Sequence, residues 1–230
     1  ESVQDSCLLI LHDWANDLLL DGAEIEKERG VIHQEWRRSM VGQMRILENL
    51  LPVIYPGSRY GYRLPIGTME VVDNFPHKEL RDYYETWYRP DQQGIIVVGD
   101  IDVKRIENKI IEMFSPIEMP ANAPERIYYP VEDNKGTIYA IGKDKEQSNA
   151  IIEIMFKQDA MPDSLKGSME YMIHNYATSM ITSMLDSRLN DMMSKPDAPF
   201  AMASSSYGEF FVAKTKDAFT VSGIAKVCNA

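Results

Sequence analysis

Four prolines fall within residues 115–130 of this 230-residue chain, namely Pro116, Pro120, Pro124 and Pro130. Proline has a fixed φ and no amide hydrogen, so this spacing excludes a regular helix or a central strand over the segment. We expect an extended linker there. The chain should therefore form two regions, one on each side of the linker, which its length allows.

The region before the linker has the pattern of a mostly helical layer. Apolar residues recur at helical spacing over 3–20, 77–88 and 103–114, and a long helix is expected from 23 to about 55. Residues 95–98, Ile-Ile-Val-Val, form an apolar run between glycines. Such a short run indicates a buried strand.

The region after the linker mixes strands with one long helix. The helix is expected to begin at Asp163-Ser164 and to run to about Leu189. The expected strands are 137–141, 150–157, 200–206, 209–214 and 219–225. Helices on an antiparallel sheet make an α+β fold.

Methionines are concentrated in this second region. Met at helical spacing normally fills a core, although a Met-rich surface can also bind partners, and we expect the core role here. His174 lies in the same helix and should be a partly buried structural residue, because no second ligand is spaced to join it. The methionines concerned are Met155, Met161, Met169, Met172, Met180, Met184, Met192 and Met193.

Glu28 and Glu35 lie seven residues apart inside the expected long helix. Seven residues are close to two turns, so both carboxylates should face the same way. A carboxylate on a rigid helix can complete a metal site, and the alternative is an ordinary solvated acidic face. His33 is rotated by roughly 200° from Glu35, so it is not expected to join the same site.

Three segments occur in an order that is typical of one protein family. They are EKERGVIHQEWR at 26–37, SRYGYRLPIG at 58–67, and LRDYYETWYRP at 80–90, which runs into GIIVVGDID at 94–102. Together they resemble the M16 (pitrilysin/insulinase) zinc peptidases of the large bacterial type. The resemblance is firm to about residue 115 and looser from 148 to 207.

The resemblance implies separate roles for the two carboxylates. Glu35 matches the family's third zinc ligand. Glu28 matches an acidic residue that does not bind the zinc itself but can orient a histidine ligand or tune the metal-bound water. It also implies a zinc-dependent endopeptidase that uses Zn²⁺ to cleave peptides or partly unfolded polypeptides. Pairing of the substrate with an edge strand would provide part of the binding.

The same resemblance implies parts of two duplicated M16-type (LuxS/MPP-like) domains, each an antiparallel sheet packed against helices. Residues 1–118 would form the C-terminal part of the catalytic domain, 119–130 a linker, and 131–230 the N-terminal part of a second, non-catalytic domain. The remaining M16 domains of the same protein would be its partners. Similarity to the large bacterial members suggests a periplasmic location.

The family's inverted zinc motif, His-x-x-Glu-His, does not occur in this sequence. The four histidines are His12, His33, His77 and His174, and none begins or ends such a motif. Catalytic zinc needs three protein ligands and an open position. In the family the motif lies upstream of the glutamate helix, and this sequence opens at Glu1 without a methionine. We therefore expect a piece of a longer protein that is inert by itself.

Composition excludes several other classes. The net charge of −11 argues against nucleic acid, which attracts basic surfaces. No apolar run reaches membrane-spanning length. Cys7 and Cys228 have no CxxC partner, so free thiols are expected rather than a disulfide framework.

Two alternatives to an active peptidase remain. A catalytically inactive M16 paralogue would act as a binding or structural subunit, but such a copy has no chemical need for Glu28 and Glu35. An unrelated α+β interaction module would share the three ordered segments only by chance.

Overall fold

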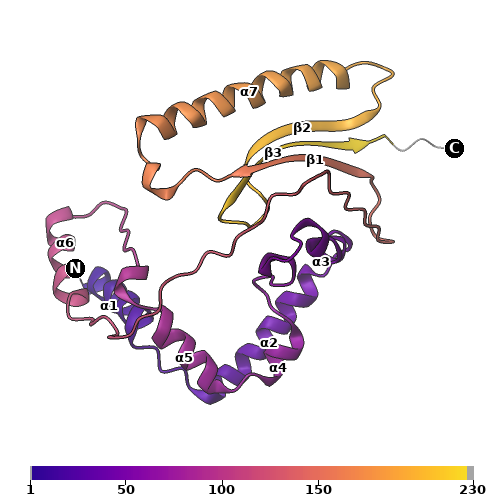
Figure 1. Ribbon diagram of the computed structural model, residues 1–230. Coiled ribbons are helices and arrows are strands. Elements are labelled where there is room, and N and C mark those ends of the chain that lie inside the picture. The colour runs from indigo at the N-terminus through magenta and orange to yellow at the C-terminus, as the bar shows by residue number, and fades with distance from the viewer. Residues whose placement is uncertain (1, 227–230) are drawn as a thin grey trace. The chain divides into compact units, whose positions relative to one another are not determined.

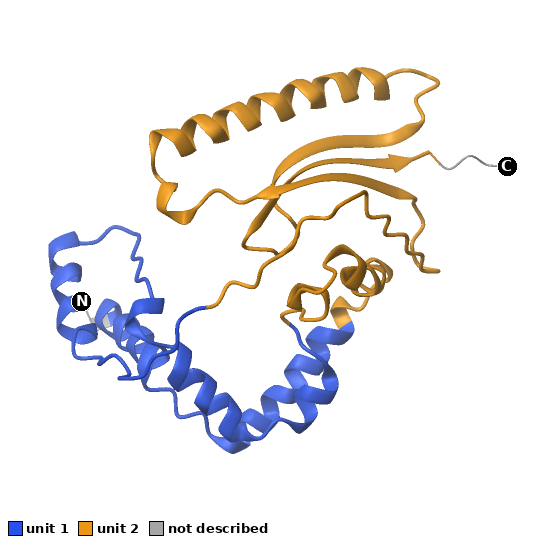
Figure 2. Cartoon of the chain, in the orientation of Figure 1, with its two compact units in different colours: residues 1–37, 66–126 blue, residues 38–65, 127–230 orange. Residues whose placement is uncertain are grey.

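The computed structural model describes residues 2–226 of the chain. The chain forms two compact units, Glu1–Arg37 with Ile66–Arg126 and Arg38–Pro65 with Ile127–Ala230 (Figure 2). Both combine distant parts of the sequence, and together they contain helices and an antiparallel sheet, which is an α+β fold as expected.

Unit 1 is helical among its described residues. Its elements are α1 (Ser2–Asn16), most of α2 (Gly22–Ser39), α4 (Met69–Asn74), α5 (His77–Trp87), η2 (Pro90–Gln92) and α6 (Val103–Phe114). Side-chain caps explain where α4 and α6 begin: Thr68 accepts a hydrogen bond from the Val71 amide and Asp102 from the Arg105 amide. The expected helices 77–88 and 103–114 are confirmed.

Arg29 fixes the orientation of α2 in unit 1. Its guanidinium donates to the carbonyl oxygens of Val72 and Phe75 at the end of α4 and lies 4.1 Å from the centroid of the Phe75 ring. One turn further on, His33 Nε2 is 2.6 Å from Asp73 Oδ1. The side of α2 that carries Arg29 and His33 therefore faces α4.

Unit 2 contains α3 (Gly42–Ile54), η1 (Arg59–Gly61), β1 (Ile151–Asp159), η3 (Asp163–Leu165), α7 (Met169–Met193), β2 (Phe200–Glu209) and β3 (Lys216–Ala225). The strands form an antiparallel sheet in the order β1-β3-β2, with Phe156 opposite Phe219 and Tyr207 also opposite Phe219. Helix α7 runs along β2 (Figure 1). The Asp186 carboxylate joins the two, accepting hydrogen bonds from both the amide and the hydroxyl of Ser205.

The expected long helix over 23–55 is wrong, because the chain breaks between α2 and α3. Val41 is extended, with ψ 165°, and Arg45 donates to the carbonyl oxygen of Met40 that the break frees. A Cβ at Gly42 would lie 3.0 Å from Asp144 Oδ1. A glycine at this position lets the start of α3 approach the segment around Asp144.

Three other expected strands and one expected helix cap are also wrong. Residues 95–98 and 137–141 are irregular, with Ile96 87% and Ile141 90% exposed, because no described strand lies beside them to pair with their backbone. Residues 209–214 belong to the β2–β3 turn, where Phe211 has φ 54°. The cap of α7 is Ser168, and Asp163 begins the separate turn η3.

The core of unit 2 gathers around Tyr55, which is 1% exposed. Its hydroxyl donates to the Phe210 carbonyl and accepts from the Val212 amide at 3.2 Å, so the end of α3 holds the β2–β3 turn. Burial raises the pKa of the Tyr55 hydroxyl. The buried residues of this cluster are Leu51, Tyr55, Val131, Phe210, Ala213 and Ala218.

The methionines of α7 do not fill a core. Met169, Met172, Met180, Met184 and Met192 are exposed, which corrects the expected core role for these five, whereas Met155 of β1 is partly buried against the core cluster of unit 2. Residues 171–185 of α7 carry no charged side chain, so the helix is apolar on several sides while β2 covers one of them. A helix with apolar residues all round is normally buried.

The accessible surface is large for the mass. It amounts to 16952 Å² for 26.3 kDa. A compact monomer of this mass exposes about 10,600 Å², and two separate compact bodies of half the mass would together expose about 12,800 Å². The accessible surface of the chain exceeds even the value for two separate compact bodies, so the division into two units does not account for all of it.

We predict that the isolated 230-residue chain self-associates, because exposed apolar surface of this extent favours association. Light scattering across a dilution series should give a mass that rises with concentration, and an apolar dye should bind strongly. A monomer at every concentration with little dye binding would contradict the prediction.

A second prediction concerns the contact between α3 and the segment at Asp144. Arg45 Nε lies 2.8 Å from Asp144 Oδ2, and this hydrogen bond lowers the pKa of the Asp144 carboxyl to about 2. A carboxyl whose pKa is lower in the folded state stabilises the fold above its unfolded pKa of about 3.9, and this contribution is lost as the pH falls toward 2.

Asp144→Asn should therefore lower the denaturation midpoint at neutral pH and flatten the loss of stability between about pH 4 and pH 2. Circular dichroism during urea unfolding at several pH values measures both effects. Asp197→Asn, at an exposed position of the same unit, is the matched control. Equal pH profiles for Asp144→Asn and the wild type would refute the role of this pair.

Candidate functional site

Glu28 and Glu35 both lie on α2, and both are exposed. Neither has a hydrogen-bond or ion-pair partner among residues 2–226. The other two glutamates of the helix differ: Glu24 lies 2.5 Å from Lys27 Nζ, and Glu26 pairs with Arg29 and with His77. These contacts lower the pKa of Glu26, with the His77 hydrogen bond as the largest cause.

The geometry of α2 determines where the two free carboxylates point. Residues 28 and 35 fall on one side of the helix, about 100° from Arg29, whose guanidinium holds α4. The packing of α2 against α4 therefore leaves Glu28 and Glu35 on a separate, open side. As expected, His33 is turned away from Glu35, toward Asp73.

Glu28 also borders a hollow of about 720 Å³ within unit 1. The lining is mostly apolar and comes from the end of α1, from α2, and from α4 and α5. The sequence did not predict this hollow, because its lining comes from four separate stretches of the chain. Its residues are Asp13, Trp14, Asp17–Asp21, Glu24, Ile25, Glu28, Arg29, Ile32, Val72, Phe75 and Leu80.

One group of possible metal ligands occurs in the described part of the chain, and it does not include either glutamate. It consists of His12, Asp13 and Asp17, whose ligand atoms lie within 4.8 Å of one another. His12 Nδ1 is 3.2 Å from Asp17 Oδ2, and its ring meets Phe114 edge-on. These are contacts of the histidine ring with neighbouring carboxylates at the end of α1.

The remaining sequence expectations concern a histidine and the cysteines. His174 is partly buried, as expected, and its ring lies edge-on to Tyr207 at 5.3 Å between centroids. Its Nε2 is buried without a hydrogen-bond partner in the described structure. Cys7 is exposed and has a free thiol, whereas Cys228 lies outside the described residues.

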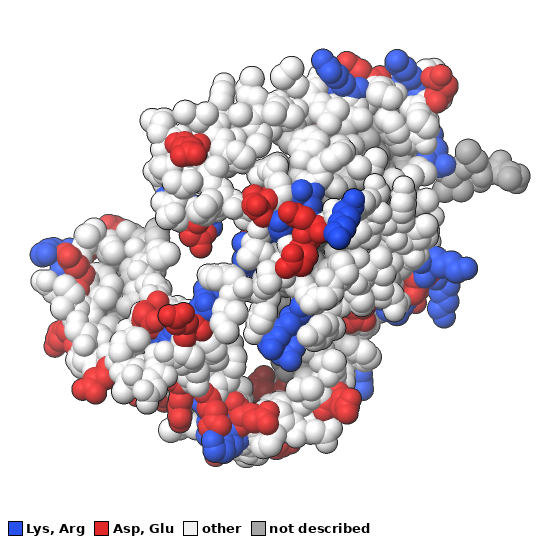
Figure 3. Space-filling view, viewed as in Figure 1, with Lys and Arg blue, Asp and Glu red and all other residues white. Residues whose placement is uncertain are grey.

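Acidic side chains outnumber basic ones in the sequence, but the two kinds are mixed on the face of the molecule in Figure 3. Many are joined in pairs such as Lys104–Glu107, Arg105–Asp5 and Lys216–Asp159. No helix among residues 2–226 combines the length and the apolar character needed to cross a membrane.

Comparison with known proteins adds a family match. The family model described as "Peptidase M16 inactive domain" matches residues 74–190, which is just over half of the chain. This segment runs from the end of α4 through the proline-rich residues into α7.

Individual relatives agree with the family match. The chain is 37% identical over 97 residues to the "Probable zinc protease PqqL" of Haemophilus influenzae, covering 42% of the chain and 10% of that protein. It is 29% identical over 185 residues to the protein of the same name in Escherichia coli, covering 80% of the chain and 19% of that protein.

A solved structure supports the fold. The first half of the periplasmic protease PqqL from Escherichia coli matches with a TM-score of 0.82 and 24% identity, covering 98% of this chain and 47% of that one. The two PqqL proteins of Haemophilus influenzae and Escherichia coli are much longer, and the chain spans a fifth or less of their length. Since the family model covers more than half of its residues, the chain belongs to the M16 peptidase family.

Proposed function

We propose that this chain is part of a zinc-dependent endopeptidase. In this proposal Glu35 is a zinc ligand, and Glu28 contacts a residue that binds the zinc rather than the zinc itself. The main support is that Glu28 and Glu35 lie on one open side of α2 and have no partner among the described residues. The chain also belongs to the M16 family. Glu24 and Glu26 of the same helix are neutralised by neighbouring bases, whereas these two are not.

The residues present fit one part of a zinc site. Carboxylate oxygen is a regular zinc ligand, and Arg29 holds α2, the helix that carries Glu35, to α4. Three protein ligands are needed, and the described residues bring no histidine to Glu35. We propose that a His-x-x-Glu-His motif elsewhere in the same protein supplies the two histidines and the general base.

Each glutamate would have its own task. When bound, zinc polarises a peptide carbonyl and makes water a better nucleophile near neutral pH. Glu35 would hold the metal and neutralise part of its charge. Glu28 would accept a hydrogen bond from a ligand histidine, which fixes the orientation of that ring. The hollow beside Glu28 has room for a segment that brings such a histidine.

The domain assignment stays part of this proposal. Residues 1–118 would complete the catalytic domain, 119–130 would link it to 131–230, and these would begin a second domain of the same type. The substrate would be a peptide or unfolded polypeptide. A periplasmic location would agree with the Escherichia coli structure, which is called a periplasmic protease.

A second candidate is an M16 subunit without activity that binds or supports a partner. The description of the matching family model as an inactive domain favours this role for residues 74–190. Glu28 and Glu35 lie outside that range. Metal content and activity of the protein that carries this chain distinguish the two candidates.

For the 230-residue chain alone, we predict no tight zinc binding and no peptide hydrolysis, because a single glutamate cannot form a catalytic zinc site. Calorimetry with zinc chloride should give only weak, non-stoichiometric heats. Tight binding of one zinc per chain would show that residues within this chain complete the site.

In the whole protein, Glu35→Gln should remove both zinc and peptidase activity. Glu28→Gln should retain most of the zinc and lose about 10–100-fold in rate or metal affinity, as changes next to a ligand do. Zinc content by atomic absorption and cleavage of a fluorogenic peptide measure the two effects.

The matched control is Glu112→Gln, which changes an exposed glutamate on α6 that pairs with Lys109. It should leave zinc content and rate unchanged. Unaltered zinc content in Glu35→Gln would show that Glu35 is not a ligand.

A further inference from the structure

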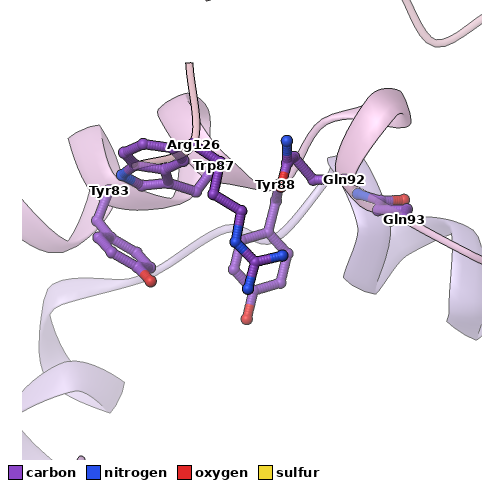
Figure 4. Close-up of a pocket in the computed structure, with 6 residues that line it drawn as sticks. All are labelled: Tyr83, Trp87, Tyr88, Gln92, Gln93 and Arg126. Carbon is purple, nitrogen blue, oxygen red and sulfur yellow. The ribbon is translucent and has the colours of Figure 1, made fainter. Parts of the chain in front are cut away.

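Helix α5 and the residue after it provide three aromatic side chains that line a second hollow of unit 1. Tyr83 and Trp87 lie one turn apart, Tyr88 follows at the helix end, and Gln92, Gln93 and Arg126 complete the lining around about 290 Å³. In Figure 4 the Arg126 side chain extends toward Tyr88, and its guanidinium lies in front of the Tyr88 ring in this view. The glutamate pair on α2 is not part of this lining.

The fold does not use the polar atoms of these aromatic residues. The hydroxyls of Tyr83 and Tyr88 and the indole N–H of Trp87 have no hydrogen-bond partner among the described residues, and the two tyrosines are 58% and 50% exposed. Tyr84 shows the contrasting structural role: it is buried, and its hydroxyl donates to the Trp14 carbonyl at 2.9 Å.

The rings are nevertheless held in place. The Tyr88 ring lies against Tyr84, with centroids 4.7 Å apart, and the Arg89 guanidinium lies 5.5 Å from the Trp87 centroid. Gln93 donates to the Ala15 carbonyl at 3.0 Å. Rigid, half-exposed Trp and Tyr beside an Arg make up the composition of binding hot spots.

A proline carbonyl is already bound next to this hollow. Arg89, which is 2% exposed, donates from Nη2 to the carbonyl oxygen of Pro124 at 2.6 Å. This contact fixes residue 124 of the proline-rich segment near α5, and Arg126 follows two residues later. The same wall of unit 1 therefore already binds one carbonyl group of a proline-containing segment.

We propose that the hollow lined by Tyr83, Trp87, Tyr88 and Arg126 binds an extended proline-containing peptide segment. A polyproline II segment has no internal hydrogen bonds, so its carbonyl oxygens need external donors, and its prolines offer flat apolar faces but no N–H. The Trp87 indole can only donate, the tyrosine hydroxyls can donate as well, and the rings supply the apolar surface. The proposal does not depend on peptidase activity.

The test uses the 230-residue chain and a decaproline peptide as probe, with an alternating Gly-Ser decapeptide as control. The chain has three tryptophans, so each indole N–H gives a separate nitrogen–proton NMR signal. Decaproline should shift the Trp87 signal in a saturable manner, and Gly-Ser should not. No shift at Trp87, or equal shifts with both peptides, would overturn the proposal.

Variants locate the site. Trp87→Phe keeps an aromatic ring and removes the donor, so decaproline should bind about 2- to 10-fold more weakly by fluorescence anisotropy of a labelled peptide. Tyr83→Phe removes only an exposed hydroxyl and should also weaken binding without affecting folding. Trp14→Phe changes an exposed tryptophan outside this hollow and should bind like the wild type. Unchanged affinity in both Trp87→Phe and Tyr83→Phe would overturn the proposal.

Discussion

The attachment of Arg29 to α4 determines what α2 can present. Its guanidinium satisfies two carbonyl groups at the end of α4 and stacks on Phe75, which fixes the rotation of α2 about its own axis. His33 and Asp73 repeat this contact one turn later. Because that side of α2 is occupied, Glu28 and Glu35 remain on an open side, and the proposed metal site depends on this orientation.

Local sequence signals predicted the elements that local contacts stabilise. Helices α5 and α6 follow from hydrophobic periodicity and from a cap or a proline at their ends, and β1 follows from its alternation. The break before Gly42 was missed because it depends on Arg45 and on Asp144, which lies 99 residues further on. The run at 95–98 resembles a buried strand, but no described strand pairs with it.

The sequence predicted that the two glutamates share one side of a helix, but it did not predict what surrounds them, and their roles stay a proposal. Spacing placed Glu28 and Glu35 on one side of a helix, and resemblance to the M16 family gave them roles. Sequence alone did not reveal that Glu24 and Glu26 are paired while these two are free, nor that Glu28 borders a hollow. Both facts arise from contacts between separate helices, as does the donor-rich hollow on α5.

The most direct test of the account is the position of zinc relative to α2 in the whole protein. Anomalous diffraction at the zinc absorption edge locates the metal without assuming its ligands. We predict one zinc ion about 2.0–2.2 Å from a carboxylate oxygen of Glu35, with Glu28 in contact with a ligand histidine. A zinc ion bound elsewhere, with the Glu35 side chain directed into solvent, would contradict it.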